Sequence, residues 1–362
     1  MDWPHFLLGE NHVILDPLLD VFRGKAITIP PLDGAFRPNT ALDEADVFKS
    51  CIAPDNIASL AGELIYSSGE NLYAANSAKP IASFGSPITA LATAVDGTVA
   101  VGLNAGGVAF HNSKASGLDG FNCPTALAFD GTHDLYVCNG SDKHGPDNWA
   151  ADLMQKNASG SLWHVSLATG ERRCLAKHLA FPYGLVVDVT KSRVIVSEAW
   201  QHRLISIPIA GGAPTPILAK LAGYPSRISR KDSGGFILSL FAPRNRLIEF
   251  VLQEDGYRNA MLNEIDSRYW IAPSLAASRS FLEPLQNGGV KTMGIHKPWS
   301  PTRSYGLIVE LDDKFLPVTS YHSRANSTRH GITSAVEHGG KFIATSRGGN
   351  VILRITPETR QA

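Results

Sequence analysis

A short motif that recurs along the chain constrains its fold more than any other feature. The motif is a proline, two variable residues and a short apolar run, and it is followed by a polar turn and a second apolar run. It reads A-P-D-N-I-A-S-L from residue 53, C-P-T-A-L-A-F-D from 123, F-P-Y-G-L-V-V-D from 181 and G-Y-P-S-R-I-S-R from 223. Paired short apolar runs around a turn predict paired β-strands. Six such units open near Pro54, Ile88, Pro124, Pro182, Pro225 and Gly331.

Several units continue into a third and a fourth apolar run, as at 160–177 and 202–220. Four short strands per unit are typical of a β-propeller blade. Six blades fit a chain of 362 residues, so the sequence predicts an all-β, six-bladed β-propeller. The alternative is a β-sandwich pair or another all-β array, but a sandwich does not need the same proline at each corner.

Two stretches interrupt the strand pattern. Residues 143–159 contain a Pro-Asp helix start signal, and residues 252–303 contain helical patches at 257–265 and 274–282. Long insertions in a compact domain usually act as lids. We therefore expect both insertions to cover one mouth of the central channel.

The N-terminal residues 1–45 are irregular and rich in proline, and we interpret them as an arm preceding a propeller at 46–362. A short helix or an arm over one face is expected at 12–22. Propellers often use a terminal strand to close the ring, so part of 40–50 is a candidate for completing the last blade.

Composition narrows the function classes. The formal net charge is zero and no basic stripe is present, so we expect no nucleic-acid partner. No apolar run approaches 18 residues, so no membrane span is expected, and without a basic leader segment a cytoplasmic location is the default. The cysteines lack metal-ligand spacing and are predicted to be mainly buried thiols: Cys51, Cys123, Cys138 and Cys174.

The variable pairs of the repeated motif are the first candidates for a functional site. The innermost strand of each propeller blade lines the channel. We therefore expect Asp55-Asn56, Thr125, Tyr183-Gly184 and Ser226-Arg227 to converge at one mouth. The alternative is that these residues only shape the turn into each blade.

The chain resembles the strictosidine synthase-like proteins, within the superfamily of six-bladed propellers that includes SMP-30, the gluconolactonases and the paraoxonases. The resemblance covers roughly residues 50–356. It is carried by D-N-W-A-A-D-L-M-Q-K-N-A-S-G-S-L-W-H-V from 147, T-G-E-R-R-C-L-A-K-H-L-A-F-P-Y-G-L-V-V-D from 169, V-I-V-S-E-A-W-Q-H-R-L from 194, L-A-G-Y-P-S-R-I-S-R from 221 and G-I-T-S-A-V-E-H-G-G from 331.

The resemblance implies a calcium site that these residues do not support. Calcium-dependent relatives place Asn where Tyr183 stands, Asp-Asn where Ser226-Arg227 stands, and another Asn near Pro124. Those side chains supply oxygen ligands to a hard cation. Here Tyr183 offers a phenol and Arg227 offers a positive charge with no acceptor. We expect no metal and no cofactor, with calcium disfavoured by Tyr183, Ser226 and Arg227.

Two roles are open for Arg227. Its guanidinium can bind a carboxylate or stabilise an oxyanion. Alternatively, it forms an ion pair with Asp55 that plugs the channel. The alkaloid-forming members of the family use a glutamate of the last blade as acid and base in a Pictet–Spengler condensation, and Thr333 stands at that position. Strictosidine synthase activity is therefore not expected.

Other candidate residues lie near the predicted ends of the channel. His330 precedes the last blade and is a natural general base, or else a loop residue that caps a turn. Glu198 ends a strand, where a structural acceptor role is the alternative. Asp142 lies where the chain enters the first insertion, and Trp270 is a lid candidate for stacking or for core packing.

These observations favour a metal-independent enzyme that hydrolyses a small ester or lactone, or catalyses the reverse cyclisation. His330 or Asp55 would handle the proton, and Arg227 would hold a carboxylate or an oxyanion. The alternatives are a non-catalytic propeller that binds a metabolite or a protein, and a calcium-dependent lactonase or arylesterase. The residues expected to contact a substrate are Tyr183, Ser226, Asn56, Thr333, Glu198, Asn139, Phe241, Arg244, His144 and Trp149.

Overall fold

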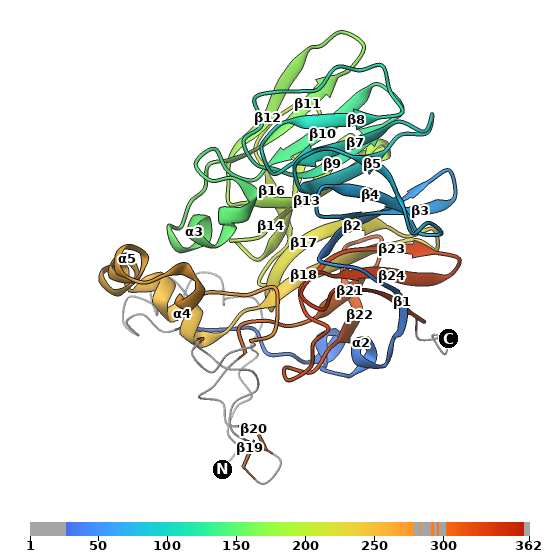
Figure 1. The fold of residues 1–362 in the computed structure, drawn as a ribbon. Helices are drawn as coiled ribbons and strands as arrows, with labels where there is room; N and C mark the ends of the chain where they lie inside the picture. Colours follow the sequence, from blue (N-terminus) through green and yellow to red (C-terminus); the bar gives the residue numbers. More distant parts are fainter. Residues whose placement is uncertain (1–26, 279–282, 284–290, 293–294, 297–301, 358–362) are drawn as a thin grey trace, which may run out of the picture.

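Six antiparallel sheets stand around a common axis (Figure 1). The structure is a computed structural model that describes residues 27–278, 283, 291–292, 295–296 and 302–357. The innermost strands of neighbouring sheets contact one another in turn and close a ring. The predicted six-bladed β-propeller is confirmed. The expected helix or arm at 12–22 lies outside the described residues.

Blades 1 to 3 begin near Pro54, Ile88 and Pro124, as predicted. Blade 1 comprises β2 (Pro54–Leu60), β3 (Glu63–Ser68), β4 (Asn71–Ala74) and β5 (Pro80–Ser83). Blade 2 comprises β6 (Ile88–Thr93), β7 (Val99–Leu103) and β8 (Val108–His111). Blade 3 comprises β9 (Pro124–Asp130), β10 (Asp134–Asn139), β11 (Gly160–Ser166) and β12 (Arg172–Leu179).

Blades 4 to 6 complete the ring. Blade 4 comprises β13 (Pro182–Asp188), β14 (Arg193–Glu198), β15 (Arg203–Pro208) and β16 (Thr215–Leu218). Blade 5 comprises β17 (Gly223–Arg230), β18 (Phe236–Pro243), β21 (Leu307–Leu311) and β22 (Pro317–His322). Blade 6 comprises β23 (Ile332–His338), β24 (Lys341–Ser346), β25 (Val351–Ile355) and the N-terminal β1 (Asp46–Ser50).

Strand β1 pairs antiparallel with β25, so the two ends of the propeller sequence meet in one sheet. The preceding segment carries η1 (Gly34–Phe36) and α2 (Ala41–Glu44), which pack against β22. The side chain of Asn39 fixes this segment, because its Nδ2 donates to Ser320 O at 2.8 Å and its Oδ1 accepts from His322 N at 2.9 Å.

The core is divided among the interfaces between blades. Each interface holds its own cluster of buried apolar side chains, supplied by the alternating apolar positions of the strands on both sides. Burial of these clusters stabilises the ring through apolar area removed from water. Cys123 and Cys138 are buried, and Cys51 and Cys174 are half-buried.

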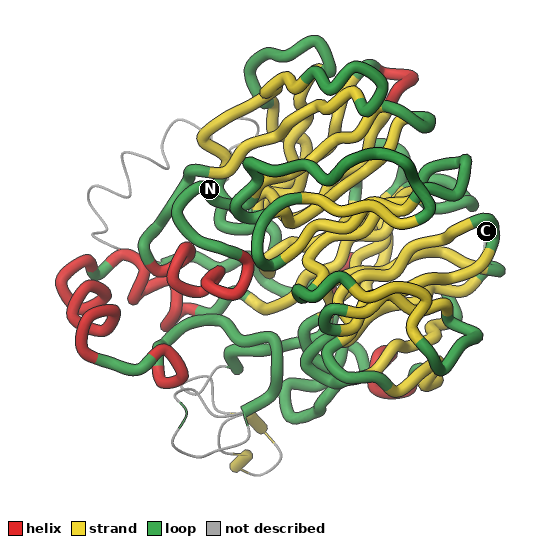
Figure 2. The backbone as a smooth tube through the Cα atoms, turned by 45° about the horizontal axis from the view of Figure 1, so that its top comes forward, coloured by secondary structure: helices red, strands yellow, loops and turns green. Residues whose placement is uncertain are grey.

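Short helices gather at one end of the propeller (Figures 1 and 2). The insertion between β10 and β11 contains η2 (Pro146–Asn148) and α3 (Trp149–Met154), at the predicted Pro-Asp signal. The insertion between β18 and β21 contains α4 (Arg246–Gln253), α5 (Asp255–Glu264), η4 (Ser267–Tyr269), β19 (Lys291–Thr292) and β20 (Ile295–His296). A further 3₁₀ turn, η3 (Val189–Lys191), lies within blade 4.

The second insertion differs from expectation in two ways. Helix α4 lies mostly before residue 252, so the insertion starts earlier than predicted. Residues 274–278 of the expected patch at 274–282 are irregular, and the rest of that patch lies outside the described residues. Apolar side chains of α3, α4 and α5 share one buried cluster with Phe181 and Trp200 of the blades, which holds the helices against the ring.

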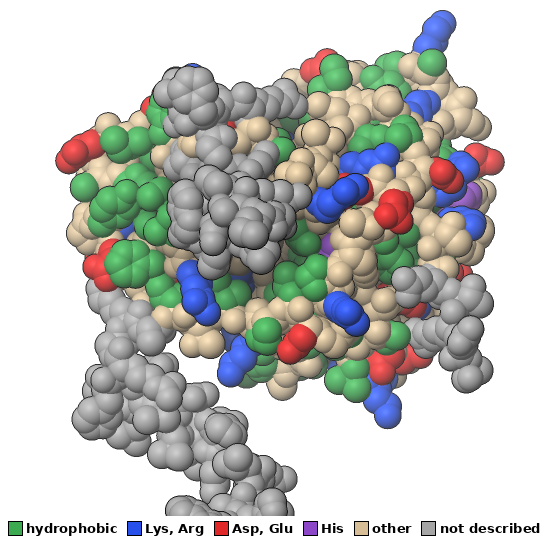
Figure 3. Space-filling model, turned by 90° about the horizontal axis from the view of Figure 1, so that it is seen from below, with side chains coloured by type: hydrophobic (Ala, Val, Ile, Leu, Met, Phe, Trp, Pro, Cys, Tyr) green, Lys and Arg blue, Asp and Glu red, His purple; other side chains and the backbone are tan. Residues whose placement is uncertain are grey.

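The described surface offers two further observations. On the face seen in Figure 3, Lys and Arg side chains are interspersed with Asp, Glu and apolar ones. Within the part of the chain that the structure describes, no helix has both the length and the apolar character to span a membrane.

Candidate functional site

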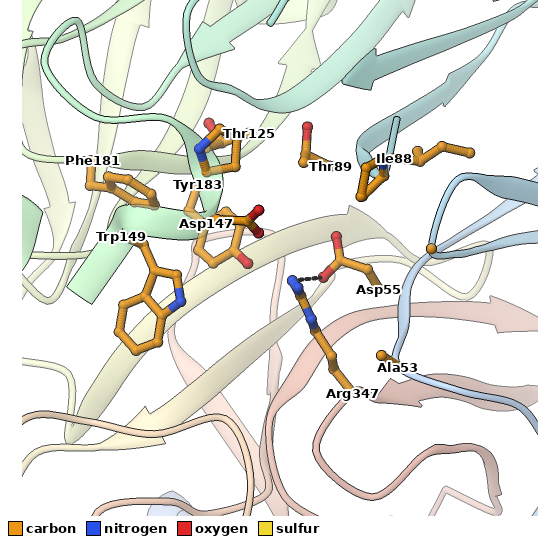
Figure 4. A pocket seen from close by; sticks show the side chains of 13 residues that line it. Ala53, Asp55, Ile88, Thr89, Thr125, Asp147, Trp149, Phe181, Tyr183 and Arg347 are labelled. Carbon is orange, nitrogen blue, oxygen red and sulfur yellow. Dashed lines mark hydrogen bonds and ion pairs between the residues drawn. The ribbon is translucent and has the colours of Figure 1, made fainter. Parts of the chain in front are cut away.

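A cavity of about 200 Å³ lies at the helical end of the channel (Figure 4). Its floor comes from the first residues of the inner strands β2, β6, β9 and β13, and its rim comes from the insertion that contains η2 and α3. The polar and aromatic lining residues are Asp55, Thr89, Thr125, Asp147, Trp149, Phe181, Tyr183 and Arg347.

All six inner strands are irregular at the same level of the channel. The pairing register of each strand with its neighbour shifts at this level, as a β-bulge produces. A bulge interrupts the regular hydrogen bonding between two strands, so the freed backbone groups point in a new direction. The residues at the shifts are Asp55-Asn56, Thr89, Thr125, Tyr183, Ser226-Arg227 and Thr333. The variable positions of the sequence motif are therefore the positions at which the inner strands bulge around the channel.

Hydroxyl groups at this level join neighbouring blades. Each donates to a main-chain carbonyl of the next inner strand, over 2.5 to 3.2 Å. The bonds are Thr89 to Pro124, Thr125 to Pro182, Ser197 to Ser226, Ser226 to Ile332 and Thr333 to Asp55. Ser226 and Thr333 are both buried. They hold the ring together and do not line the cavity.

We call the level of the channel at which the six inner strands bulge the neck. The guanidinium of Arg227 lies in this neck. Nη1 donates to Asp55 O at 3.2 Å and to Thr333 O at 3.3 Å. Nη2 donates to Asp55 Oδ2 at 2.9 Å, to Thr125 O at 3.3 Å and to Thr89 O. Arg227 also lines a second hollow of about 440 Å³, formed by the later residues of the inner strands, Asn56 among them. The expected alternative of an Arg227–Asp55 ion pair in the channel is the one observed.

Asp55 joins two guanidinium groups. Its Oδ2 pairs with Arg227, and its Oδ1 accepts from Arg347 Nη1 at 3.2 Å. The carboxylate is buried, whereas the side chain of Arg347 is 34% exposed and faces the cavity. Burial acts to lower the pKa of Arg347, but the Asp55 carboxylate beside it acts in the opposite direction, and the net effect raises that pKa. Arg347 therefore stays charged, and its Nε and Nη2 have no hydrogen-bond partner among the described residues.

Tyr183 covers the neck from the cavity side. The Arg227 Cζ atom lies 5.0 Å from the centre of its ring, a cation–π contact. Burial raises the pKa of the Tyr183 hydroxyl, and the Asp55 carboxylate raises it further. The group is therefore a neutral donor at physiological pH. No partner for this hydroxyl is found in the described part of the chain, and Figure 4 places it inside the cavity near Arg347.

A second carboxylate, Asp147, stands at the rim of the cavity. Its Oδ2 accepts from Asn104 Nδ2 at 2.5 Å, which ties the first insertion to blade 2. Trp149 follows in the same insertion and packs edge-to-face on Phe241, with ring centres 5.4 Å apart. The cavity thus combines aromatic walls with one accessible guanidinium, one neutral phenol and an exposed carboxylate.

The neck residues do not fit a calcium ion. Calcium requires six to eight oxygen ligands, usually with several carboxylates. Among the residues that the structure describes, Asp55 supplies the carboxylate at the neck, and both of its oxygens face guanidinium groups. No group of three or more His, Cys, Asp or Glu side chains that could hold a metal occurs in the described ranges.

The structure places His330 away from the cavity. Its ring is buried, with Nδ1 at 2.8 Å from Ser304 Oγ and Nε2 at 2.9 Å from Arg324 O. Burial lowers its pKa, and both ring nitrogens are engaged by these two protein groups. This environment gives His330 no route to the proton-transfer role expected from the sequence.

Three more candidates hold loops and strands together. Glu198 is buried and accepts from Ala180 N at 2.8 Å and from Arg203 Nε at 2.6 Å. Asn139 accepts from Cys123 N at 2.7 Å and donates to Asp142 Oδ1 at 2.6 Å. His144 Nε2 lies 2.9 Å from Gln155 Oε1, across the first insertion. None of these side chains lines the cavity.

The remaining candidates support the helical cover. Phe241 is buried behind the cavity wall, with its ring centre 5.7 Å from that of Tyr183. Arg244 Nη2 pairs with Glu249 Oε2 of α4 at 2.9 Å. Trp270 is buried, and its Nε1 donates to Ile265 O at 2.9 Å. Of the lid candidates, Trp149 lines the cavity and Trp270 does not.

Arg347 and Asp147 are the charged cavity residues that sequence reasoning missed, together with the uncharged Thr89 and Phe181. A signal for Arg347 exists, because the second strand of a blade returns to the end where the first strand began. The residue after β24 must therefore lie beside the openers, as Gly69 does after β3. In the sequence, Asp147 stands out only as part of the Pro-Asp helix start signal.

Comparisons with known proteins agree with this architecture. A family model described as strictosidine synthase matches residues 126–209. Adipocyte plasma membrane-associated protein of Salmo salar is 22% identical over 215 residues, 59% of this chain and 46% of that protein. Protein Strictosidine Synthase-Like 6 of Arabidopsis thaliana is 22% identical over 235 residues, 65% of this chain and 55% of that protein. The chain spans about half the length of these curated relatives.

A solved structure shares the fold. It is a calcium-binding protein, regucalcin, from Agrobacterium tumefaciens, with a TM-score of 0.53 at 9% identity, covering 86% of this chain and 92% of that chain. At this identity the likeness concerns the fold alone. The family model and the Arabidopsis relative confirm the resemblance of the chain to the strictosidine synthase-like proteins, and the solved structure confirms the six-bladed propeller fold.

Proposed function

We propose that this protein is a metal-independent, strictosidine synthase-like enzyme that binds a small carbonyl compound in the cavity and hydrolyses an ester or lactone. One observation carries the proposal. Arg347 is held by Asp55 through one N–H and turns its remaining donors into a cavity with aromatic walls. Donors fixed before the substrate arrives stabilise a developing oxyanion without reorganisation.

The cavity residues support a division of labour. Arg347 and the Tyr183 hydroxyl would hold the carbonyl oxygen, and the rings of Trp149 and Phe181 would pack on the apolar part of the substrate. Asp147 would take a proton from water as the water oxygen attacks the carbonyl carbon. The C–O bond to the leaving alkoxide then breaks, and the alkoxide receives that proton. Ring closure of a hydroxy acid is the same path in reverse.

This division reassigns two roles of the sequence-based hypothesis, the oxyanion role of Arg227 and the proton-transfer role of His330 or Asp55. Arg227 is committed to main-chain carbonyls in the neck, so the oxyanion role passes to Arg347. Asp55 is held by two guanidinium groups and acts as a positioning residue. Proton transfer then falls to Asp147, the other carboxylate at the cavity.

A second candidate, a non-catalytic metabolite-binding propeller, is favoured by the same feature of Asp55. Both carboxylate oxygens of Asp55 are paired with guanidinium groups, so the carboxylate left to act as a base is Asp147 at the solvent-exposed rim of the cavity. Such a site binds a carboxylate well, because Arg347 can pair with it in a bidentate manner.

The test is hydrolysis of a panel of small esters and lactones with EDTA present. Arg347→Ala should lower kcat/KM about 100-fold, as expected for one oxyanion donor. The matched control is Arg324→Ala, which removes an exposed guanidinium that also pairs with an aspartate, Asp43, away from the cavity. Turnover that requires calcium, or turnover unchanged in Arg347→Ala, would contradict the proposal. Binding without turnover would support the second candidate.

A further inference from the structure

Every inner strand contributes to the surroundings of one guanidinium group. Main-chain carbonyl oxygens of β2, β6, β9 and β23 accept from Arg227, through Asp55, Thr89, Thr125 and Thr333. Strand β13 supplies the Tyr183 ring, and β17 supplies Arg227 itself. The residues that accept from Arg227 lie 102 to 172 positions away in the sequence.

This environment is that of a cation site. Carbonyl oxygens and a carboxylate are the groups that proteins place around cations, and their dipoles here point at one buried centre. The bulges at the same level free these carbonyls from the hydrogen bonding between strands. The ring of the un-ionised Tyr183 side chain adds a cation–π contact. A guanidinium suits the arrangement because its donors are planar and radiate outward, whereas a spherical ion needs ligands on all sides.

We propose that Arg227 is the resident cation of the channel. Its guanidinium occupies a site of four main-chain carbonyls and the Asp55 carboxylate, and removal of the side chain leaves a site for a free guanidinium ion. The disagreement with a calcium site follows directly, because a calcium ion and this guanidinium compete for the same oxygens. The proposal concerns the neck and does not depend on the chemistry in the cavity.

The test is chemical rescue of Arg227→Ala. Loss of the buried cation leaves Asp55 with one ion-pair partner, Arg347, and removes the Arg227 donor from the carbonyls of Thr89, Thr125 and Thr333, so Tm should fall by about 5 °C. Millimolar guanidinium, far below denaturing concentrations, should restore part of this loss by binding the native state. Sodium chloride or urea at the same concentration should not restore the Tm. The matched control is Arg230→Ala, on the same strand with a half-exposed side chain that stacks on Phe236.

Three outcomes overturn the proposal. The first is a folded Arg227→Ala protein whose Tm responds to guanidinium no differently from Arg230→Ala. The second is a rise in the Tm of the unmodified protein with calcium. Should Arg227→Ala not fold, Arg227→Lys decides the matter, since it keeps a charge with fewer donors. The proposal expects this variant to fold with a Tm below that of the unmodified protein, and a lysine variant that also fails to fold is the third contrary outcome.

Discussion

Asp55 Oδ2 accepts a hydrogen bond from Arg227 Nη2 at 2.9 Å, although the two residues lie 172 positions apart. The bond crosses the channel from blade 1 to blade 5 and is buried at both ends. It fixes the carboxylate so that its other oxygen holds Arg347 at the cavity. One acidic residue thereby connects the integrity of the ring to the geometry of the candidate site.

Asp55→Asn should lower the free energy of unfolding by about 3–5 kcal/mol, because it leaves buried guanidinium charge without its counter-ion. Denaturant unfolding measures this directly. Asp266→Asn is the control, since Asp266 is exposed and pairs with exposed Arg268, and it should change stability little. Equal small effects of the two substitutions would show that the buried pair does not stabilise the ring.

Tyr183→Phe should lower kcat/KM about tenfold while leaving Tm nearly unchanged. The variant keeps the ring that covers Arg227 and removes only the hydroxyl, which has no partner among the described residues. Steady-state kinetics together with thermal unfolding separate the two effects. A large fall in Tm would mean that the hydroxyl has a structural role, and unchanged kinetics would remove it from the substrate site.

Acid should destabilise the protein through buried histidine. Burial lowers the pKa of His322 to about 4, against about 6.5 in an unfolded chain. Between these values the unfolded state binds more protons, so stability falls as pH falls, by about 3 kcal/mol over the window. Burial also lowers the pKa of His330, so protonation of His330 in acid destabilises the folded state in the same way. Unfolding measured from pH 7 to 4 should give a flatter slope for His322→Asn, and an equal slope would contradict this account.

Gly184→Ala should destabilise the protein by about 1–3 kcal/mol through overpacking. A Cβ atom at Gly184 would lie 2.7 Å from Arg227 Cα and nearer still to Ser226 O, where β13 approaches β17 at the neck. Gly256→Ala is the matched control, because its Cβ would meet no atom within 4 Å and it lies in helix α5. A neutral result at Gly184 would mean that the two inner strands can separate without cost.

Much of the fold could be predicted from the sequence because the repeated motif is local. Proline followed by an alternating apolar run marks each inner strand, so the six openers near Pro54, Ile88, Pro124, Pro182, Pro225 and Gly331 coincide with β2, β6, β9, β13, β17 and β23. Helix α4 was missed because its apolar run closely follows β18, although the N-cap at Asn245 and the helical spacing of the buried Ile248 and Val251 both indicate a helix.

The candidate site was less predictable because it depends on contacts between distant blades. Sequence placed Asp55, Tyr183 and Arg227 at the channel, but it could not show that the two Nη groups of Arg227 donate to four carbonyls and to the Asp55 carboxylate. His330 stands next to the last opener, yet its ring turns toward Ser304, a contact that follows from the packing of blade 5 against blade 6.

The most direct test of the account is a thermal shift of the unmodified protein and Arg347→Ala, with EDTA present, against small lactones, esters and carboxylates. Ligands that bind the native state raise Tm by mass action. The account predicts that at least one lactone or carboxylate raises the Tm of the unmodified protein, that Arg347→Ala loses this shift, and that calcium changes neither. A shift that survives in Arg347→Ala, or one that appears only with calcium, would contradict it.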